Sequence, residues 1–172
     1  MNIILTGMPG CGKSTSGNAI AKELGLKYID TDKRIEKKYK MPIPRIFKLV
    51  GEIGFRKLES EILQKIISTE NKYVLATGGG LPCSHGNMDS LNDAGITFYI
   101  KVMPAILSQR IYNSKKIRPL TANMTRLEIE EYTQELLKVR EIFYLKSKYI
   151  YTLSMGNITD FIRRKLEIKT HS

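Results

Sequence analysis

Short apolar runs alternate along the chain with longer stretches in which hydrophobic residues recur every three or four positions. Five of the apolar runs have the length of a strand: Asn2–Thr6, Lys27–Asp30, Tyr73–Thr77, Ile96–Val102 and Lys148–Leu153. Strands that alternate with helices form a parallel sheet whose two faces are both covered. The pattern therefore predicts an α/β fold of three layers around a five-stranded parallel sheet.

The stretches between the strands carry signals for helix ends. Pro104 suits the first position of a helix, and Asn157 suits an N-cap. Thr125 and Glu128 have the spacing of a capping box, in which each side chain satisfies a backbone N–H of the other residue. With the helical spacing of apolar residues, these signals predict helices over Thr15–Leu24, Gly51–Ile67, Ala105–Tyr112 and Thr125–Leu145, and from Asn157 to Leu166.

Composition is typical of a soluble globular protein, with 42% hydrophobic and 26% charged residues among 172. No linker divides the chain, so we expect a single domain over residues 1–172. No apolar run is long enough to span a bilayer and no signal peptide is recognisable, so we expect a cytoplasmic protein without a membrane partner. Two cysteines and two histidines are too few for a zinc site or a histidine-based triad.

The net charge of +11 favours negatively charged partners, which are nucleic acids or small anionic substrates. Such a balance occurs in nucleic-acid binders, and that is the alternative reading. The basic residues are spread along the chain, however, and no RNA-binding aromatic signature accompanies them. We therefore expect solvated helix faces and a positive field that attracts anionic substrates, with no nucleic-acid partner.

Residues 7–14 read Gly-Met-Pro-Gly-Cys-Gly-Lys-Ser, the phosphate-binding P-loop pattern G-x-x-x-x-G-K-[ST]. The pattern lies between the first predicted strand and the first predicted helix, where backbone N–H groups and the positive helix end can hold a polyphosphate. Lys13 would reach the β- and γ-phosphates, and the Ser14 hydroxyl would bind Mg²⁺. The sequence therefore predicts binding of a nucleoside triphosphate with Mg²⁺ by Gly10, Cys11, Gly12, Lys13, Ser14 and Thr15.

The stretch 113–124 has no helical periodicity and carries Lys115, Lys116 and Arg118. In a P-loop protein, a polar and basic loop at this place predicts a lid that moves over the nucleotide. A plain surface connection is the alternative.

Two acids and three glycines follow predicted strands. Asp30 and Asp32 come at the end of the second strand, and Gly78–Gly80 at the end of the third. Because strand ends face the ligand crevice of an open α/β sheet, one acid can orient Mg²⁺ through water, and the other can accept a proton from a substrate hydroxyl. The alternatives are an N-cap for Asp32 and a flexible turn for the glycines.

Arg56, Arg118 and Arg140 are candidate anion clamps, because the planar guanidinium matches a carboxylate or a phosphate. The alternative for each of the three is an ordinary surface arginine. Arg56 in particular can pair with Glu52 or Glu59, which lie near it on the same helical face.

In their order along the chain these residues resemble shikimate kinase, and the resemblance covers nearly the whole chain. The shared set comprises Gly7–Thr15, Asp30-Thr31-Asp32, Ile46-Phe47 with Gly51-Glu52, Phe55-Arg56 with Glu59, Ala76–Gly80, Arg118-Pro119 with Leu120, and Arg140 four residues before Tyr144. The P-loop occurs in many families, but the ordered set is far more specific.

The resemblance implies transfer of the γ-phosphoryl group of ATP to the 3-hydroxyl of shikimate, in aromatic amino-acid biosynthesis. It implies a P-loop fold of the nucleoside monophosphate kinase type, with a lid at about 113–124 and a substrate-binding helical region at about 31–62. We expect a monomer that uses ATP as co-substrate and Mg²⁺ as cofactor.

The resemblance also implies a role for each matching residue. The catalytic set would be Lys13, Asp32 and Arg118, with Asp32 at the acceptor hydroxyl and Arg118 reaching the transferring phosphate from the lid. Shikimate would be bound by Asp32, by Arg56 and Arg140 at its carboxylate, and by Gly78, Gly79 and Gly80. Nucleotide contacts would include Arg110 on the adenine side, and Mg²⁺ would be held by Ser14 and, through water, Asp30.

The chain departs from the family pattern at Pro42, Pro44, Arg45, Thr121 and Ser147-Lys148. Two prolines fix φ and remove donors, so we expect an altered entry into a helix over Arg45–Val50. None of the departures removes a named catalytic group. A gluconate-type sugar-acid kinase is the alternative enzyme, and an ATP-binding regulatory or nucleic-acid-binding module is the alternative without catalysis.

The two cysteines lead to a separate hypothesis. Cys11 lies in the P-loop beside a helix N-terminus and Lys13, which both favour a thiolate, and Cys83 follows the three glycines. We expect alkylation or oxidation to inactivate the protein by blocking the phosphate site. Two buried, inert thiols are the alternative.

Overall fold

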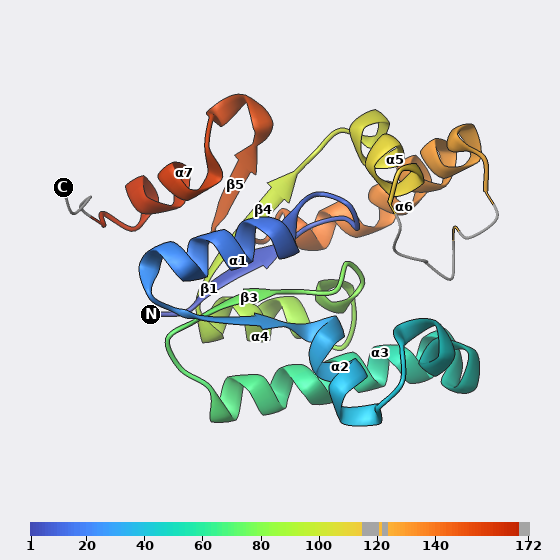
Figure 1. Cartoon of the computed structure of the whole chain (residues 1–172), viewed down its shortest axis with the longest axis horizontal. Helices are drawn as coiled ribbons and strands as arrows, with labels where there is room; N and C mark the ends of the chain where they lie inside the picture. The colour runs from blue at the N-terminus through green and yellow to red at the C-terminus, as the bar shows by residue number, and fades with distance from the viewer. Residues whose placement is uncertain (115–120, 122–123, 169–172) are drawn as a thin grey trace.

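The computed structural model describes residues 1–114, 121 and 124–168. Five parallel strands form one sheet in the order β2-β3-β1-β4-β5 (Figure 1). In chain order they are β1 (Ile3–Thr6), β2 (Lys27–Asp30), β3 (Tyr73–Ala76), β4 (Ile96–Lys101) and β5 (Tyr149–Thr152). The predicted α/β class and the five predicted strands are confirmed, and every strand end lies within one residue of its predicted place.

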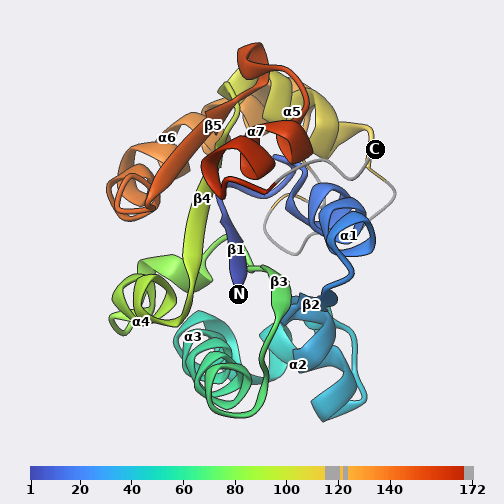
Figure 2. The same cartoon turned by 90° about the vertical axis from the view of Figure 1, so that its left-hand side faces the viewer.

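Helices cover both faces of the sheet. In β1, Ile3 and Leu5 belong to one buried cluster and Ile4 to the other, because successive strand residues point to opposite faces. The first cluster includes residues of α1 (Lys13–Leu24), α5 (Pro104–Tyr112), α6 (Arg126–Tyr144) and α7 (Ile158–Lys165), and the second includes residues of α2 (Thr31–Tyr39), α3 (Ile43–Thr69) and α4 (Asn87–Ala94). Figure 2 shows helices on either side of the strands, with α1 on one side and α4 on the other, which gives the three expected layers.

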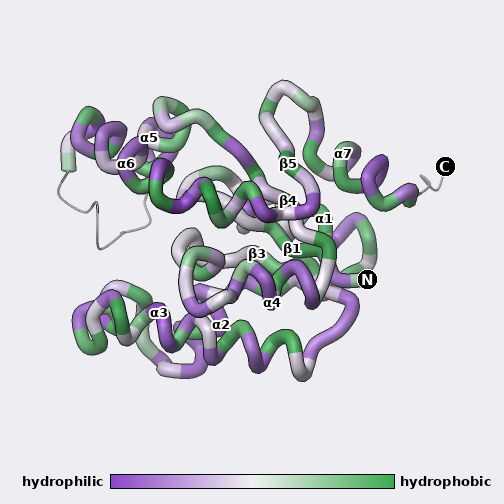
Figure 3. The backbone as a smooth tube through the Cα atoms, turned by 180° about the vertical axis from the view of Figure 1, so that it is seen from behind, coloured by the Kyte–Doolittle hydropathy of each residue, from purple (hydrophilic) through white to green (hydrophobic). Residues whose placement is uncertain are grey.

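Most of the helices begin and end where the sequence signals indicate. At the start of α6, the Glu128 N–H donates to Thr125 Oγ1 at 3.3 Å and the Thr125 N–H donates to Glu128 Oε2 at 2.6 Å, so the predicted capping box is confirmed. The Asn157 side chain caps α7 as expected. The helices alternate between hydrophobic and hydrophilic residues along their length (Figure 3). The short helix α4 was not predicted, because Met88 and Leu91 alone carry its apolar side.

Helix α3 differs from the prediction at its start. It begins at Ile43, with Pro42 as the N-cap residue and Pro44 in the first turn, where proline is tolerated because those N–H groups have no partner within the helix. The Ile43 N–H instead donates to Glu36 Oε1 of α2 at 3.2 Å. At Gly51 the backbone leaves the helix, with φ 69° and ψ −178°, so two helical segments meet there as the sequence indicated.

The strand register brings three functional loops to one edge of the sheet. Ala76 of β3 is the partner of Leu5 in β1 and of Asp30 in β2. Because these strands are parallel, the loops that follow them emerge side by side. These loops are the P-loop, the Asp30–Asp32 segment and Gly78–Gly80. Among the described helices, none is long and apolar enough to cross a membrane.

Candidate active site

The P-loop connects β1 to the N-terminus of α1. Gly12, the N-cap residue of α1, has φ 106°, which a residue with a Cβ rarely adopts. No described side chain caps this helix end. The first backbone N–H groups of α1 therefore face the loop without an internal partner, and this is the arrangement that binds a phosphate.

Lys13 lies folded against its own loop. Its side chain is 7% exposed, and its ammonium donates to the Gly7 carbonyl at 2.7 Å and to the Met8 carbonyl at 2.9 Å. The same ammonium is 3.5 Å from Cys11 Sγ. Among the described residues the partners of this buried ammonium are neutral, which leaves a positive charge beside the helix N-terminus, where an anion is stabilised.

Asp30 links the P-loop helix to β2. Its Oδ2 accepts hydrogen bonds from the Ser14 hydroxyl at 2.9 Å and from the Tyr28 hydroxyl at 3.2 Å. Its Oδ1 accepts the Lys33 N–H at 3.3 Å, which makes Asp30 the N-cap of α2. Burial, followed by the charge of Asp30, raises the pKa of Tyr28 to about 12, so that hydroxyl keeps its proton and donates.

The structure gives the role of helix cap to Asp30, whereas one interpretation of the sequence gave it to Asp32. The alternative that Asp32 caps the following helix is wrong, because Asp30 has that role and Asp32 lies in the first turn of α2. Asp32 instead faces Gly78, since a Cβ added there would lie 2.8 Å from Asp32 Oδ1. Its carboxylate is thus directed at the pocket described next.

A pocket of about 810 Å³ lies above the edge of the sheet where these loops emerge. It is lined by the P-loop with Ser14, by Asp30 and Asp32, by the segment Gly78–Gly80, and by residues of α3 and α6. The predicted site residues that it brings together are Ser14, Asp30, Asp32, Arg56, Gly78, Gly79, Gly80 and Arg140. Residues far apart in the sequence therefore share one cavity of ligand size.

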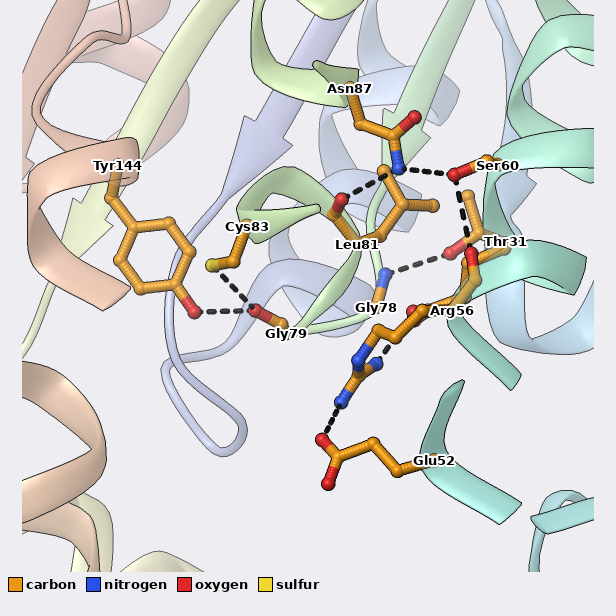
Figure 4. Close-up of polar contacts among 11 residues, drawn as sticks. Thr31, Glu52, Arg56, Ser60, Gly78, Gly79, Leu81, Cys83, Asn87 and Tyr144 are labelled. Atoms are coloured by element: carbon orange, nitrogen blue, oxygen red, sulfur yellow. Dashed lines mark hydrogen bonds and ion pairs between the residues drawn. The ribbon is translucent and has the colours of Figure 1, made fainter. Parts of the chain in front are cut away.

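Arg56 of α3 forms ion pairs and also lines the pocket. Its Nη1 is 2.6 Å from Glu59 Oε2 and its Nη2 is 3.1 Å from Glu52 Oε1. A Cβ added at Gly80 would lie 2.3 Å from Arg56 Cζ, so the guanidinium occupies the space that this glycine leaves open. The pairing that the sequence offered as an alternative to an anion clamp is present, and it holds the arginine at the pocket wall (Figure 4).

Glu59 lines the pocket, although the sequence named it only as a pairing partner of Arg56 and as part of the shared set, and not as a site residue. It is 1% exposed, and an added Cβ at Gly78 would lie 2.8 Å from its Oε1. Burial raises the pKa of Glu59 to about 7, although the charge of Arg56 opposes the shift. Two features of the sequence could have identified Glu59 as a site residue: it lies three residues after Arg56, and it lies beside the apolar stripe of the helix.

The glycine segment is held from both sides. The Gly78 N–H donates to Thr31 Oγ1 at 2.7 Å, and the Gly79 carbonyl accepts the Tyr144 hydroxyl of α6. Figure 4 shows Tyr144 and Arg56 approaching this segment from opposite directions. Arg140, 9% exposed, lies one turn before Tyr144 and lines the pocket. Two of the three glycines are therefore hydrogen-bonded to side chains of neighbouring elements, and the flexible turn stays an alternative.

Arg110 lies beside the P-loop, and Arg118 lies outside the described residues. The Arg110 Nη1 donates to the carbonyls of Gly10 at 3.4 Å and Cys11 at 3.3 Å. The described part of the predicted lid is limited to 113–114, 121 and 124, of which Thr121 lines the pocket. The mobility of the segment 113–124 therefore stays a prediction.

The two cysteines differ in burial, since Cys11 is buried and Cys83 is half-buried. Cys11 is 3% exposed under the P-loop. Burial raises the pKa of the Cys83 thiol, which favours the unreactive protonated form. For Cys83 this supports the inert alternative.

Three comparisons with known proteins agree with one another. The family model described as "Shikimate kinase" matches residues 9–166. A shikimate kinase of Azobacteroides pseudotrichonymphae genomovar. CFP2 is 38% identical, over 93% of this chain and 94% of that protein. One of Phocaeicola vulgatus is 40% identical, over 87% and 85%.

Solved structures extend the similarity to the fold. The shikimate kinase of Bacteroides thetaiotaomicron superposes with a TM-score of 0.91 at 31% identity, covering 98% of this chain and 99% of that one. The Acinetobacter baumannii enzyme, described in complex with shikimate, gives 0.85 at 34% identity, covering 97% and 91%.

Proposed function

The chain belongs to the shikimate kinase family of ATP-dependent phosphotransferases, and we propose that its own residues transfer the γ-phosphoryl group of ATP to the 3-hydroxyl of shikimate in the pocket of about 810 Å³. One observation carries this proposal. The pocket brings a phosphate-binding helix end, a carboxylate on α2 and two arginines on α3 and α6 to a single cavity. Binding of ATP alone requires only the first of these.

The P-loop would hold the nucleotide phosphates. The uncapped start of α1 offers backbone N–H groups, and the Lys13 ammonium would exchange the carbonyls of Gly7 and Met8 for phosphate oxygens. Because phosphoryl transfer depends mainly on positioning and charge neutralisation, this lysine would stabilise the charge that develops on the transferred group. Arg110 and, from outside the described residues, Arg118 would add positive charge.

The residues beside the P-loop fit Mg²⁺. The Ser14 hydroxyl and the Asp30 carboxylate meet at 2.9 Å, and Mg²⁺ prefers a few oxygen ligands while it keeps several waters. Within the described residues, no group of three or more metal-ligating side chains competes as a site. Bound there with the nucleotide, Mg²⁺ would supply positive charge to the phosphates, with Asp30 acting through water.

The acceptor would be held at both ends. Arg56 and Arg140 are the two arginines that line the pocket, and their guanidinium groups match the carboxylate of shikimate. Glu52 and Glu59 keep Arg56 in place before the acceptor arrives. Asp32 would contact the 3-hydroxyl and take up its proton, a task that does not require a strong base if the transition state is loose.

We further propose a single domain, with the lid at 113–124 and the substrate-binding region at 31–62, that acts as a cytoplasmic monomer without nucleic acid. The absence of a membrane-spanning helix among the described residues and the spread of basic residues along the chain support this proposal.

The experiment that tests the function is shikimate-dependent formation of ADP. We expect the purified protein to release ADP from Mg-ATP when shikimate is added and not when gluconate is added. The matched variants are Arg56→Ala and Arg140→Ala. Each should weaken shikimate binding by roughly 2–5 kcal/mol, because a desolvated carboxylate loses a charged partner, and ATP affinity should stay close to that of the wild type. Turnover with gluconate alone would move the assignment to a sugar-acid kinase, and equal losses for both substrates would contradict the clamp.

A further inference from the structure

Strand β2 and helix α1 face one another through two residues each. Because alternate residues of a strand point to the same side, Tyr28 and Asp30 share a face, whereas Ile29 between them belongs to the core on the other side of the sheet. On α1, Ser14 and Gly17 are three residues apart and therefore lie on one face of the helix.

The two faces are in close contact. Ser14 Oγ lies 2.9 Å from Asp30 Oδ2, and a Cβ added at Gly17 would lie 2.9 Å from Tyr28 Cε2. Glycine at position 17 thus leaves room for the tyrosine ring directly beside the helix, next to the residue that begins the phosphate site. This packing fixes where the Tyr28 hydroxyl can reach.

The hydroxyl reaches the carboxylate that faces the pocket. Tyr28 Oη donates to Asp30 Oδ2 at 3.2 Å, the same oxygen that accepts the Ser14 hydroxyl. Ser14 and Asp30 line the pocket, and Tyr28 is not among the lining residues. A serine hydroxyl that donates its hydrogen to Asp30 keeps its lone pairs for a metal ion, so the Ser14–Asp30 contact can persist when nucleotide and metal bind.

We propose that Tyr28 is a positioning residue, which holds the Asp30 carboxylate against Ser14 and thereby strengthens the binding of Mg²⁺ with the nucleotide. This inference rests on the proposed assignment of Ser14 and Asp30 to Mg²⁺. Its physical basis is that an outer partner which fixes the orientation of a ligand determines how much free energy that ligand contributes to metal binding. Without the phenol, the Asp30 carboxylate keeps its charge and loses one of its three hydrogen bonds in the described structure.

The test compares nucleotide affinity with and without metal, which does not depend on turnover. Isothermal titration calorimetry gives the Kd of ADP in the absence of divalent ions and in the presence of Mg²⁺. The ratio of the metal-free Kd to the Kd with Mg²⁺ measures how much the metal strengthens binding. Tyr28→Phe removes the hydroxyl and keeps the ring that packs beside Gly17. We expect this variant to lower the ratio about three- to tenfold, with the Kd of metal-free ADP and the melting temperature close to wild type.

Asp30→Asn separates the inference from the function on which it rests. Asparagine caps a helix as well as aspartate does, so the variant should fold while it loses the carboxylate charge. We expect a lower ratio, and no further decrease when Tyr28→Phe is added. A lower ratio for Asp30→Asn with an unchanged ratio for Tyr28→Phe overturns the role of Tyr28 alone. An unchanged ratio for Asp30→Asn overturns both the metal assignment and the inference.

Tyr73→Phe is the matched control. Tyr73 of the neighbouring strand β3 is a buried tyrosine, and its hydroxyl has no hydrogen-bond partner among the described residues. Removal of that hydroxyl should leave the ratio as it is in the wild type. An equal decrease in Tyr73→Phe and Tyr28→Phe would mean that the effect is a general one of tyrosine replacement, which overturns the proposal.

Discussion

A single methyl group at position 80 should impair substrate binding without unfolding the protein. Gly80 has φ −90° and ψ −17°, which alanine adopts without strain. The added Cβ would lie 2.3 Å from Arg56 Cζ and 2.3 Å from its Nη1, where ordinary contacts begin at 3.4 Å. The guanidinium must therefore move by about 1 Å or more. It is the far end of a flexible side chain, so it can move at little cost to stability.

The size of the effect follows from what Arg56 does in the proposed site. A displacement of about 1 Å in a positioning group can cost about 100-fold in rate or affinity, which is close to the lower end of the roughly 2–5 kcal/mol expected for loss of a charged partner. We expect Gly80→Ala to raise the KM for shikimate by about that factor. The KM for ATP should remain near the wild-type value, because the three atoms nearest the added Cβ all belong to Arg56 and none to the P-loop.

The assay is ADP formation over a range of shikimate concentrations, with thermal unfolding of the same samples. The double variant Gly80→Ala with Arg56→Ala is the control. If the methyl group acts through Arg56, it should have no further effect once that side chain is absent. A KM for shikimate within twofold of wild type in Gly80→Ala would refute the reasoning, and so would full additivity in the double variant.

Three further predictions concern charge in the site. Lys13→Ala should lower turnover about a thousandfold or more, because it removes a charge that stabilises the transferred group, and near-normal turnover would contradict the P-loop assignment. Asp32→Asn should lower turnover strongly with little change in ATP affinity measured by titration calorimetry, whereas a change in stability alone would make Asp32 a structural residue. For Glu59, burial raises the pKa from 4.5 to about 7, so its contribution to folding is fully present below about pH 4.5 and is lost as the pH rises through 7. Urea unfolding should therefore show Glu59→Gln gaining stability relative to wild type between about pH 4.5 and 7, and parallel curves would be the contrary result.

The local features of the site could be predicted because they depend on neighbours in the chain. The P-loop is one continuous segment, and its glycines, lysine and serine have their roles from spacing alone. The strands could be located within a residue because each is a short apolar run. The capping box of α6 depends on Thr125 and Glu128, three residues apart.

Other local expectations were modified by contacts from elsewhere in the chain. The two prolines at the start of α3 indicated an unusual helix entry, but Glu36 of α2, which receives the Ile43 N–H, was not foreseen. The sequence also left open whether Asp32 caps the helix that follows the second strand, and it did not propose Asp30 for that role. The geometry of the strand end decided it, because Asp30 still has an extended backbone and can reach back to the Lys33 N–H.

By itself, then, the sequence determined the fold class, the phosphate-binding segment and the residue types available for the chemistry. Only the tertiary structure decided which of those residues meet. Tyr144 contacts Gly79, Arg56 fills the space above Gly80, and Tyr28 shares Asp30 with Ser14. These pairs are joined by the order of the strands and the packing of α1, α3 and α6, and burial then changes the charge behaviour of a residue such as Glu59. Spacing along the chain carries no record of such contacts, because they arise from segments that only folding brings together.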